Sequence, residues 1–379
     1  MKKSLVLASL LAAFGAASAQ SSVTMYGWVD LSLTQAKTTT GAAGLPAGYS
    51  YGAGNFSGVS QTRLDSGNVN GSRWGIRGSE ALGGGLNAIF TIETGIAADT
   101  ANNNTGTFST GGRQVFAGLS SANMGTFTAG RQYSSYDDTR SGMSPMGHTS
   151  FDANLNVWSA NGINYTGRAA NSLKYKSANY SGFTFGAAYA LGEDKTVAAS
   201  ASNITAINLG YAVGPIAVAF ATQKEKVGVA GTQAVTASGP TGAFGAITGG
   251  LLNNLVPAGG TNKSNTMLIG SYNFGVAKLT LGMNNGKSNA AGFNTEKETV
   301  IGVNVPLGAV TVDAAYAMSK QKASYKANGF GVQAIYALSP RTSAYVGLMN
   351  MKADTNPAAG ASANIAKYSI TSVGLRHNF

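Results

Sequence analysis

The sequence predicts an all-β fold: a transmembrane antiparallel β-barrel of about sixteen strands, with short turns at one end and long loops at the other. Apolar and polar side chains alternate along most segments of the chain. Only 11% of the 379 residues are charged, and there are 52 glycines and no cysteine. Charged residues make up about a quarter of a typical soluble chain, so the composition disfavours an ordinary soluble domain.

The N-terminus has the three parts of a secretory signal peptide. Lys2 and Lys3 form a basic start, residues 5–17 are apolar, and Ala17-Ser18-Ala19 offers small residues for cleavage. A membrane anchor is the alternative, but a spanning helix needs about 20 apolar residues. We therefore expect residues 1–19 to be removed on export and residues 20–379 to form a single barrel domain.

The strands are indicated by a period of two. In the first segment after the signal peptide, Val29, Leu31 and Leu33 share one parity, whereas Asp30 and Ser32 share the other. The same alternation recurs at residues 73–77, 86–93 and 310–316. Successive side chains of a strand point to opposite faces, so each segment has one apolar face, which a barrel turns towards lipid.

Two kinds of connection alternate along the chain. Short turns are expected at residues 82–85, 121–125, 178–182, 214–215, 273–275, 306–308 and 339–341. Long polar connections are expected at residues 36–70, 97–111, 132–167, 192–202, 224–264, 284–295, 319–327 and 352–364. Short periplasmic turns and longer extracellular loops are typical of outer-membrane barrels.

Aromatic residues recur near the expected strand ends, where they would form girdles at the membrane interfaces. They are Tyr26, Trp28, Tyr175, Tyr189, Tyr211, Tyr272, Tyr336 and Tyr345. The last residue, Phe379, ends an alternating segment, so we expect the final strand to close on the first. A soluble β-sandwich also alternates, but its polar faces should carry more charge.

The charge balance disfavours several functions. The formal net charge is +11, or +9 without Lys2 and Lys3, but the basic residues are dispersed rather than clustered. Nucleic-acid binding is therefore not expected. The chain has no cysteine, no closely spaced histidine pair and no nucleotide-binding glycine motif, so we expect no cofactor and no metal.

Four stretches resemble the trimeric general porins of Gram-negative outer membranes, closest to the anion-selective porins of betaproteobacteria. They are residues 22–27, residues 72–80 running into 82–85, residues 113–119 followed by 130–132, and residues 373–379. The resemblance implies a homotrimer of 16-stranded barrels, surrounded by outer-membrane lipid and lipopolysaccharide. It implies a third long loop, residues 132–167, folded into the lumen. It also implies that Phe379 is the signal read by the barrel-assembly machinery.

The resemblance further implies a constriction with a ladder of three arginines. By motif these are Arg73, Arg113 and Arg168, and the matching acidic residues that face them are Glu93 and Asp137. Such a channel passes small hydrophilic solutes and ions by passive diffusion and prefers anions.

Strand parity supports part of this assignment independently. Trp74 and Ile76 take the face opposite Arg73 and Arg77, and a lipid-facing arginine costs roughly 2–4 kcal/mol near mid-bilayer, so both arginines should point inward. The same test turns Glu93 inward. It also groups Arg168 with two further basic residues, Lys174 and Lys176.

For Arg113 the parity test is weaker, because the apolar Val115 and Ala117 share its parity. We interpret Arg77, Lys174 and Lys176 as general lumen charge. Permanently charged arginines in a narrow lumen create a positive potential that raises the local anion concentration.

Three alternatives remain open at this stage. A barrel enzyme would need a histidine base, but His377 has lipid-facing parity and His148 merely adjoins Thr149 and Ser150, so no enzyme is expected. A plugged barrel could act as an adhesin or structural protein through its loops at residues 36–70 and 224–264. A substrate-specific porin is the third alternative, although no inward run of aromatic residues is visible.

Overall fold

The computed structural model describes residues 21–40, 60–100, 113–158, 163, 165–226, 228, 262–289, 295–321, 325–355 and 364–379. The signal peptide predicted at residues 1–19 lies outside this part of the chain. Among the described residues, no helix has the length and apolar character needed to cross a membrane.

Nearly all of the described secondary structure is strand. The strands are β1 (Ser22–Thr40), β2 (Ser60–Ser66), β3 (Arg73–Gly83), β4 (Leu86–Gly95), β5 (Val115–Ser121), β6 (Gly125–Tyr133), β7 (Arg168–Lys176), β8 (Phe183–Leu191), β9 (Asn203–Val213), β10 (Ile216–Lys226), β11 (Lys263–Asn273), β12 (Lys278–Ser288), β13 (Glu296–Leu307), β14 (Val310–Gln321), β15 (Tyr325–Ala337), β16 (Thr342–Thr355) and β17 (Asn364–Asn378). The helices are α2 (Ser135–Gly142) and α3 (Ala153–Val157).

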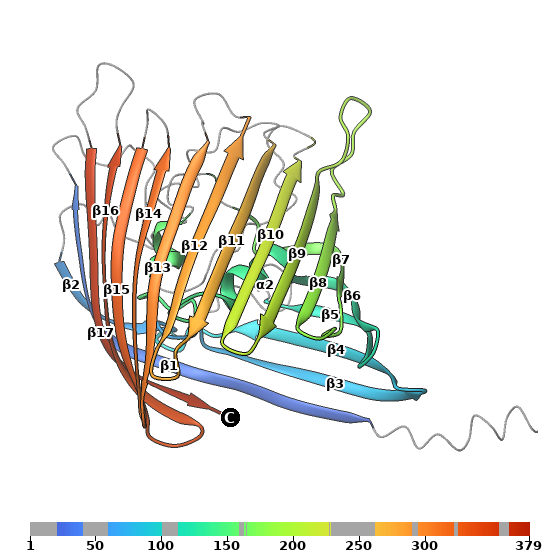
Figure 1. Cartoon of the computed structure of the whole chain (residues 1–379), viewed down its shortest axis with the longest axis horizontal. Coiled ribbons are helices and arrows are strands. Elements are labelled where there is room, and N and C mark those ends of the chain that lie inside the picture. The colour runs from blue at the N-terminus through green and yellow to red at the C-terminus, as the bar shows by residue number, and fades with distance from the viewer. Residues whose placement is uncertain are drawn as a thin grey trace, which may run out of the picture.

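The sheet closes on itself through its first and last strands. Each strand from β3 to β16 pairs antiparallel with the strand that follows it in the sequence, and β17 pairs with β1. Strands β2 and β3 are not paired with each other. The other edge of β1 is shared, because its first half pairs with β3 and its second half with β2. Strands β2 and β3 therefore occupy one position in the ring, and the structure is a closed barrel of 16 strand positions, as predicted (Figure 1).

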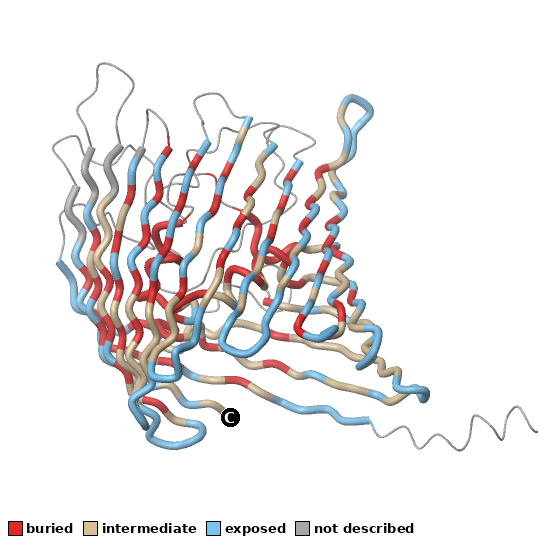
Figure 2. The backbone as a smooth tube through the Cα atoms, viewed as in Figure 1, coloured by how far each residue is buried: buried red, intermediate tan, exposed pale blue. Residues whose placement is uncertain are grey.

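The two faces of the wall differ as the alternation predicted. In β1, Asp30, Ser32 and Thr34 are buried on the inner face, whereas Val29 and Leu33 are exposed on the outer face. Figure 2 shows the same alternation of buried and exposed residues along the neighbouring strands. An outer surface of exposed apolar side chains would be a liability in water, but it suits a lipid environment.

The buried apolar core lies between the inner wall and the segment that joins β6 to β7. This segment, which we call the third loop, contains α2 and α3; α2 contacts β8, β9 and β10, and α3 contacts β14, β15 and β16. The loop therefore crosses the lumen, as Figure 1 shows for α2 inside the ring. Phe151 of this loop packs so closely on β15 and β16 that a Cβ on Gly331 or Gly347 would overlap it.

Several loop boundaries predicted from the sequence were wrong by a few residues or more. Strand β1 runs to Thr40, β2 begins at Ser60 and β12 runs to Ser288, all inside segments predicted to be loops. The strand ends near the long loops are polar on both faces, so they lack the apolar alternation by which strands were recognised.

Three aromatic residues predicted to lie in the interfacial girdles face the lumen instead. Tyr26 donates a hydrogen bond to Glu93, and the Trp28 ring lies against the guanidinium of Arg73. Tyr345 is buried and donates to the carboxylate of Asp30. All three lie at inward-facing positions of their strands. The alternation along the strand therefore predicts the direction of their side chains correctly, whereas nearness to a strand end does not.

Candidate pore constriction

The structure brings the three predicted arginines together around Glu93. Arg73 begins β3, Arg113 precedes β5, Arg168 begins β7, and Glu93 lies near the end of β4. The Arg113 Nε donates to Glu93 Oε1 at 2.5 Å, and the Arg73 Nη1 lies 3.6 Å from Glu93 Oε2. Tyr26 donates its hydroxyl to the same Oε2 at 3.2 Å. The carboxylate thus holds two arginines in place.

Tyr133 connects the third arginine to this group. Its hydroxyl oxygen accepts a hydrogen bond from Arg113 Nη2 and another from Arg168 Nη2, each at 3.0 Å. The Arg168 guanidinium also lies 4.7 Å from the centre of the Tyr133 ring, within the range of a cation–π interaction. The result is one connected row: Arg73, Glu93, Arg113, Tyr133 and Arg168. No pattern in the sequence indicated the bridging role of Tyr133.

Arg113 reaches this row because the chain around it is not a regular strand. Its backbone N–H donates to the carbonyl of Glu93 at 3.2 Å, and the carbonyl of Gln114 accepts from the Glu93 N–H at 2.8 Å. Strand β5 begins only at Val115. The parity that groups Arg113 with the apolar Val115 and Ala117 therefore does not apply to it.

The position of Tyr133 opposite Arg168 depends on a local irregularity. The register between β6 and β7 shifts between Gly130 and Gln132, and Asn171 takes a positive φ of 51°. Gly130 itself has a φ of 137°, and a Cβ there would overlap the backbone of Val115. Bulges often redirect a side chain near a functional site.

The row carries an excess of positive charge. It contains three arginines and one carboxylate. The chain's 15 acidic residues all lie in the described segments, and the ion pairs found there do not include Arg168. The Arg168 charge is therefore not neutralised by a contacting carboxylate.

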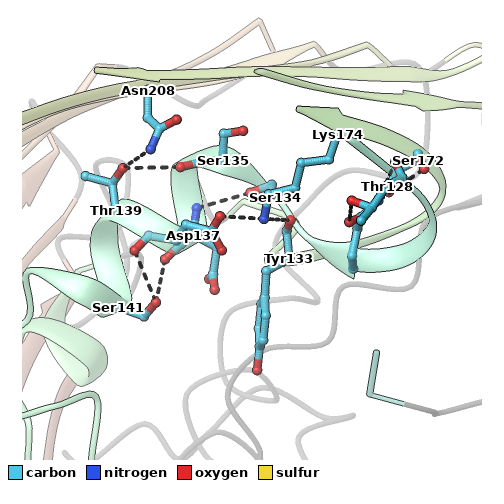
Figure 3. Close-up of polar contacts among 12 residues, drawn as sticks. Thr128, Tyr133, Ser134, Ser135, Asp137, Thr139, Ser141, Ser172, Lys174 and Asn208 are labelled. Atoms are coloured by element: carbon cyan, nitrogen blue, oxygen red, sulfur yellow. Dashed lines mark hydrogen bonds and ion pairs between the residues drawn. The ribbon is translucent and has the colours of Figure 1, made fainter. Parts of the chain in front are cut away.

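The acidic residues of α2 lie beside this row rather than in it. Asp138 forms an ion pair with Lys174, whose Nζ also donates to the carbonyl of Tyr133 at 2.9 Å. Figure 3 shows the Tyr133 ring pointing away from Lys174. Asp137 is buried and accepts a hydrogen bond from the Tyr165 hydroxyl at 2.6 Å. Burial raises the pKa of Asp137, although this hydrogen bond and the charges of Arg140 and Arg168 oppose the rise.

The third loop is fastened to the wall opposite the arginines. Thr149 donates to Gln333 Oε1 at 2.7 Å, and Gln333 Nε2 donates to the Asp313 carboxylate at 2.7 Å. Trp158 Nε1 donates to the carbonyl of Thr299 at 3.0 Å. These bonds fix the loop at several points, so its lumen-facing side has a defined position.

The remaining predicted lumen charges do not contact the three arginines. Arg77 is exposed and lies 5.2 Å from the ring centre of Tyr26. Lys176 is exposed at the end of β7. Phe379 donates its backbone N–H to the carbonyl of Gly27 at 3.0 Å, so the C-terminus is held against β1.

Neither histidine has the surroundings of a catalytic base. His148 is half-buried in the third loop, and its buried Nε2 has no hydrogen-bond partner among the described residues. Burial lowers the pKa of His148 to about 3. His377 is exposed on the outer face, where its Nδ1 lies 2.9 Å from the Thr342 hydroxyl.

Comparisons with known proteins agree with this geometry. The family model described as Gram-negative porin matches residues 6–356. Outer membrane porin protein 32 of Delftia acidovorans is 32% identical over the full length of both chains. An outer membrane porin protein of Bordetella pertussis is 34% identical over 58% of each chain. The solved structure of the anion-selective porin from Comamonas acidovorans superposes with a TM-score of 0.69 at 25% identity, covering 95% of this chain and 100% of that one.

Proposed function

Because the chain belongs to the Gram-negative porin family and is an outer-membrane diffusion channel, we propose that Arg73, Arg113 and Arg168 line its constriction and make it prefer anions. The observation that carries the proposal is the connected row of three arginines with a single carboxylate. The anion-selective porin with the same fold supports it.

The row would act on ions by its electrostatic potential. An anion that passes the arginines loses part of its hydration shell, and the guanidinium N–H groups replace part of it. Glu93 holds Arg73 and Arg113 in place, and Tyr133 holds Arg113 and Arg168. Anchored arginines present their charge without closing tightly around the anion, and conduction needs such weak binding because each ion must also leave.

We assign the acidic residues different roles. Glu93 is the acidic group within the arginine row. Asp137 belongs to the buried interior of α2, and its charge acts on Arg168 from a distance. Arg77, Lys174 and Lys176 contribute to the general potential of the lumen.

The working protein would be a homotrimer that contacts lipid and lipopolysaccharide. Residues 1–19 would be cleaved on export, and Phe379 would direct insertion by the barrel-assembly machinery. Cross-linking of the purified protein, N-terminal sequencing and insertion of a chain lacking Phe379 test these three points separately. The proposal includes no catalytic role and no cofactor. The solutes would be small anions and small polar molecules.

The reversal potential in a planar bilayer under a KCl gradient tests the function. We expect the potential to show chloride preference in the wild-type protein and a weaker preference in Arg73→Ala. As a control, Lys195→Gln removes a positive charge from the exposed β8–β9 connection and should leave the potential unchanged. Potassium preference would contradict the role of the arginines, and the absence of steady current would favour a plugged barrel.

A further inference from the structure

The ring position shared by β2 and β3 is interrupted where β2 ends and β3 begins. Residues 67–72 join the two strands, and we call this segment the inner strap. Asn68, Val69 and Ser72 of the strap are buried, and the strap bonds to inward-facing side chains of β1 and β17. The strap therefore lies inside the barrel, against the seam where the first and last strands pair.

Asp30 of β1 anchors the strap to the wall. One oxygen of its carboxylate accepts hydrogen bonds from the backbone N–H groups of Val69 at 2.9 Å and Asn70 at 2.7 Å. The other oxygen accepts from the hydroxyl of Tyr345 on β16. Asp30 is fully buried, and hydrogen bonds to an ionised acceptor are among the strong ones. The carboxylate therefore fixes the backbone of the strap.

Asn68 anchors the strap a second time. Its side-chain nitrogen lies within hydrogen-bond distance of three hydroxyl oxygens, those of Ser32 at 2.7 Å, Thr34 at 3.0 Å and Ser372 at 3.3 Å. Ser32 and Thr34 belong to β1, and Ser372 belongs to β17. An amide offers two N–H donors, which these three acceptors share, so the side chain ties the strap to both strands of the seam.

The strap also contacts the third loop. The backbone N–H of Ser150 in that loop donates to the carbonyl of Asn68 at 2.7 Å. Val69 of the strap belongs to the same buried apolar cluster as Phe151, the next residue of the loop, and Tyr345. The third loop therefore packs on the strap as well as on the wall.

The end of the strap contacts Arg73, the first residue of β3. The Arg73 Nε donates to the carbonyl of Gly71 at 2.9 Å, a closer contact than the 3.6 Å between its Nη1 and Glu93. The Trp28 ring, whose centre lies 4.2 Å from the Arg73 guanidinium, donates its Nε1–H to the carbonyl of Asn70 at 3.3 Å. One short segment thus contacts both an arginine of the row and the third loop.

We propose that the inner strap positions the two sides of the constriction relative to each other, and that Asn68 is a positioning residue for the preference for anions. Asn68 acts through its neighbours: the strap sets where Arg73 presents its charge and limits how far the third loop can move. The proposal rests on the proposed function in taking Arg73 as a charge that passing ions meet.

Asn68→Ala tests the proposal without changing any charge. Loss of the amide loosens the strap, so Arg73 should move away from the ion path. If its distance from a passing ion grows from about 6 to about 12 Å, the permeability ratio of chloride to potassium should fall about twofold in a planar bilayer under a KCl gradient. Ser120→Ala removes a hydroxyl that bonds to Thr126 between β5 and β6, away from the strap, and should leave the ratio unchanged.

A double variant shows whether Asn68 acts through Arg73. Asn68→Ala added to Arg73→Gln should give the same permeability ratio as Arg73→Gln alone, because the charge that the strap positions is already gone. A further fall of the same size would overturn the proposal. If Asn68→Ala fails to insert, Thr34→Val with Ser372→Ala removes two of the three acceptors of the Asn68 amide and should lower the ratio in the same way.

A thiol label tests the contact with the third loop independently of selectivity. The chain has no cysteine, so Ser150→Cys introduces a single thiol, and the hydroxyl that it replaces has no hydrogen-bond partner among the described residues. Ser150 is buried, so a methanethiosulfonate reagent should react slowly with this variant in detergent, and at least about tenfold faster once Asn68→Ala is added. Adding Ser120→Ala should leave the rate unchanged.

The two measurements separate this proposal from the proposed function. Equal reaction rates with and without Asn68→Ala would overturn the strap, as would a faster reaction with an unchanged permeability ratio in an anion-preferring channel. A wild-type protein without chloride preference would contradict the proposed function, whereas faster labelling in the same protein would still support the contact between strap and loop.

Discussion

Replacing Arg168 by glutamine should lower the preference for anions, because this arginine has no contacting carboxylate to neutralise it. A unit charge about 6 Å from a passing ion contributes about 0.7 kcal/mol in water. Screening at 0.1 M salt, where the Debye length is about 10 Å, reduces this to about 0.4 kcal/mol. The charge favours the anion and disfavours the cation by this amount, so its loss should reduce the permeability ratio of chloride to potassium about fourfold.

The assay is the reversal potential of single channels under a KCl gradient, measured at two ionic strengths. Arg168→Lys keeps the charge and should retain most of the preference. Glu93→Gln removes the only carboxylate of the row and should shift the ratio in the opposite direction by a similar factor. Both shifts should become larger as the salt concentration falls, because the screening weakens.

The opposite signs make the reasoning refutable. If Arg168→Gln and Glu93→Gln shift the permeability ratio of chloride to potassium in the same direction, the shift comes from a change in the shape of the pore. The charges of Arg168 and Glu93 would then not explain the measured selectivity. If neither variant shifts it while Lys195→Gln does, selectivity is set at the loops instead of the arginine row.

Three further changes test other parts of the site. Tyr133→Phe removes the hydroxyl that accepts hydrogen bonds from Arg113 and Arg168, each worth roughly 1.5–3 kcal/mol. The channel should still prefer anions, but the open-channel current noise should rise because the two arginines are held less firmly. Unchanged noise would argue against the role of Tyr133 as a link between them. Gly331→Val should displace Phe151 and speed proteolysis within residues 143–158, whereas Gly270→Ala, whose added Cβ would make only ordinary van der Waals contacts, should not. The pKa of the half-buried His148 is lowered to about 3, so the unfolded chain binds a proton first and stability falls as pH drops from about 6.5 towards 3. His148→Asn, which tolerates the positive φ, should reduce this acid-induced fall in the thermal midpoint, and an unreduced fall would assign the acid sensitivity to other groups.

Much of the fold could be predicted because lipid and lumen impose opposite chemistry on successive residues. The alternation of Trp74 and Ile76 with Arg73 was enough to define a strand and its inner face, and the structure agrees. The same reasoning fails where both faces are polar. That is why the outer part of β1 and the whole of β2 were assigned to a loop.

Part of the arginine row could not be predicted from periodicity alone. Parity holds only inside a regular strand, and Arg113 lies just before one. The bridging role of Tyr133 depends on a register shift at Gly130, which alternation does not reveal. The resemblance to known porins supplied Arg113, but neither it nor periodicity supplied Tyr133.

The third loop covers acidic residues of the inner wall, whose charges would otherwise offset those of the arginines. The inner faces of β10, β13 and β14 carry Glu225, Glu298 and Asp313, and all three are buried. Their carboxylates accept hydrogen bonds from neighbouring amides: Gln223 donates to Glu225, Asn284 to Glu298 and Gln333 to Asp313.

The loop packs over this acidic wall, and its own groups contribute to the covering bonds. The backbone N–H of Thr166 donates to Glu225 at 2.6 Å, and the Thr149 hydroxyl donates to the Gln333 that binds Asp313. These carboxylates are covered and hydrogen-bonded, and Arg113 and Arg168 are buried to a similar degree, whereas Arg73 remains partly exposed, with 13% of its side-chain surface accessible. If the arginine row sets the proposed preference for anions, Arg73 is its most accessible charge, and the cover over the acidic groups of β10, β13 and β14 adds to that preference.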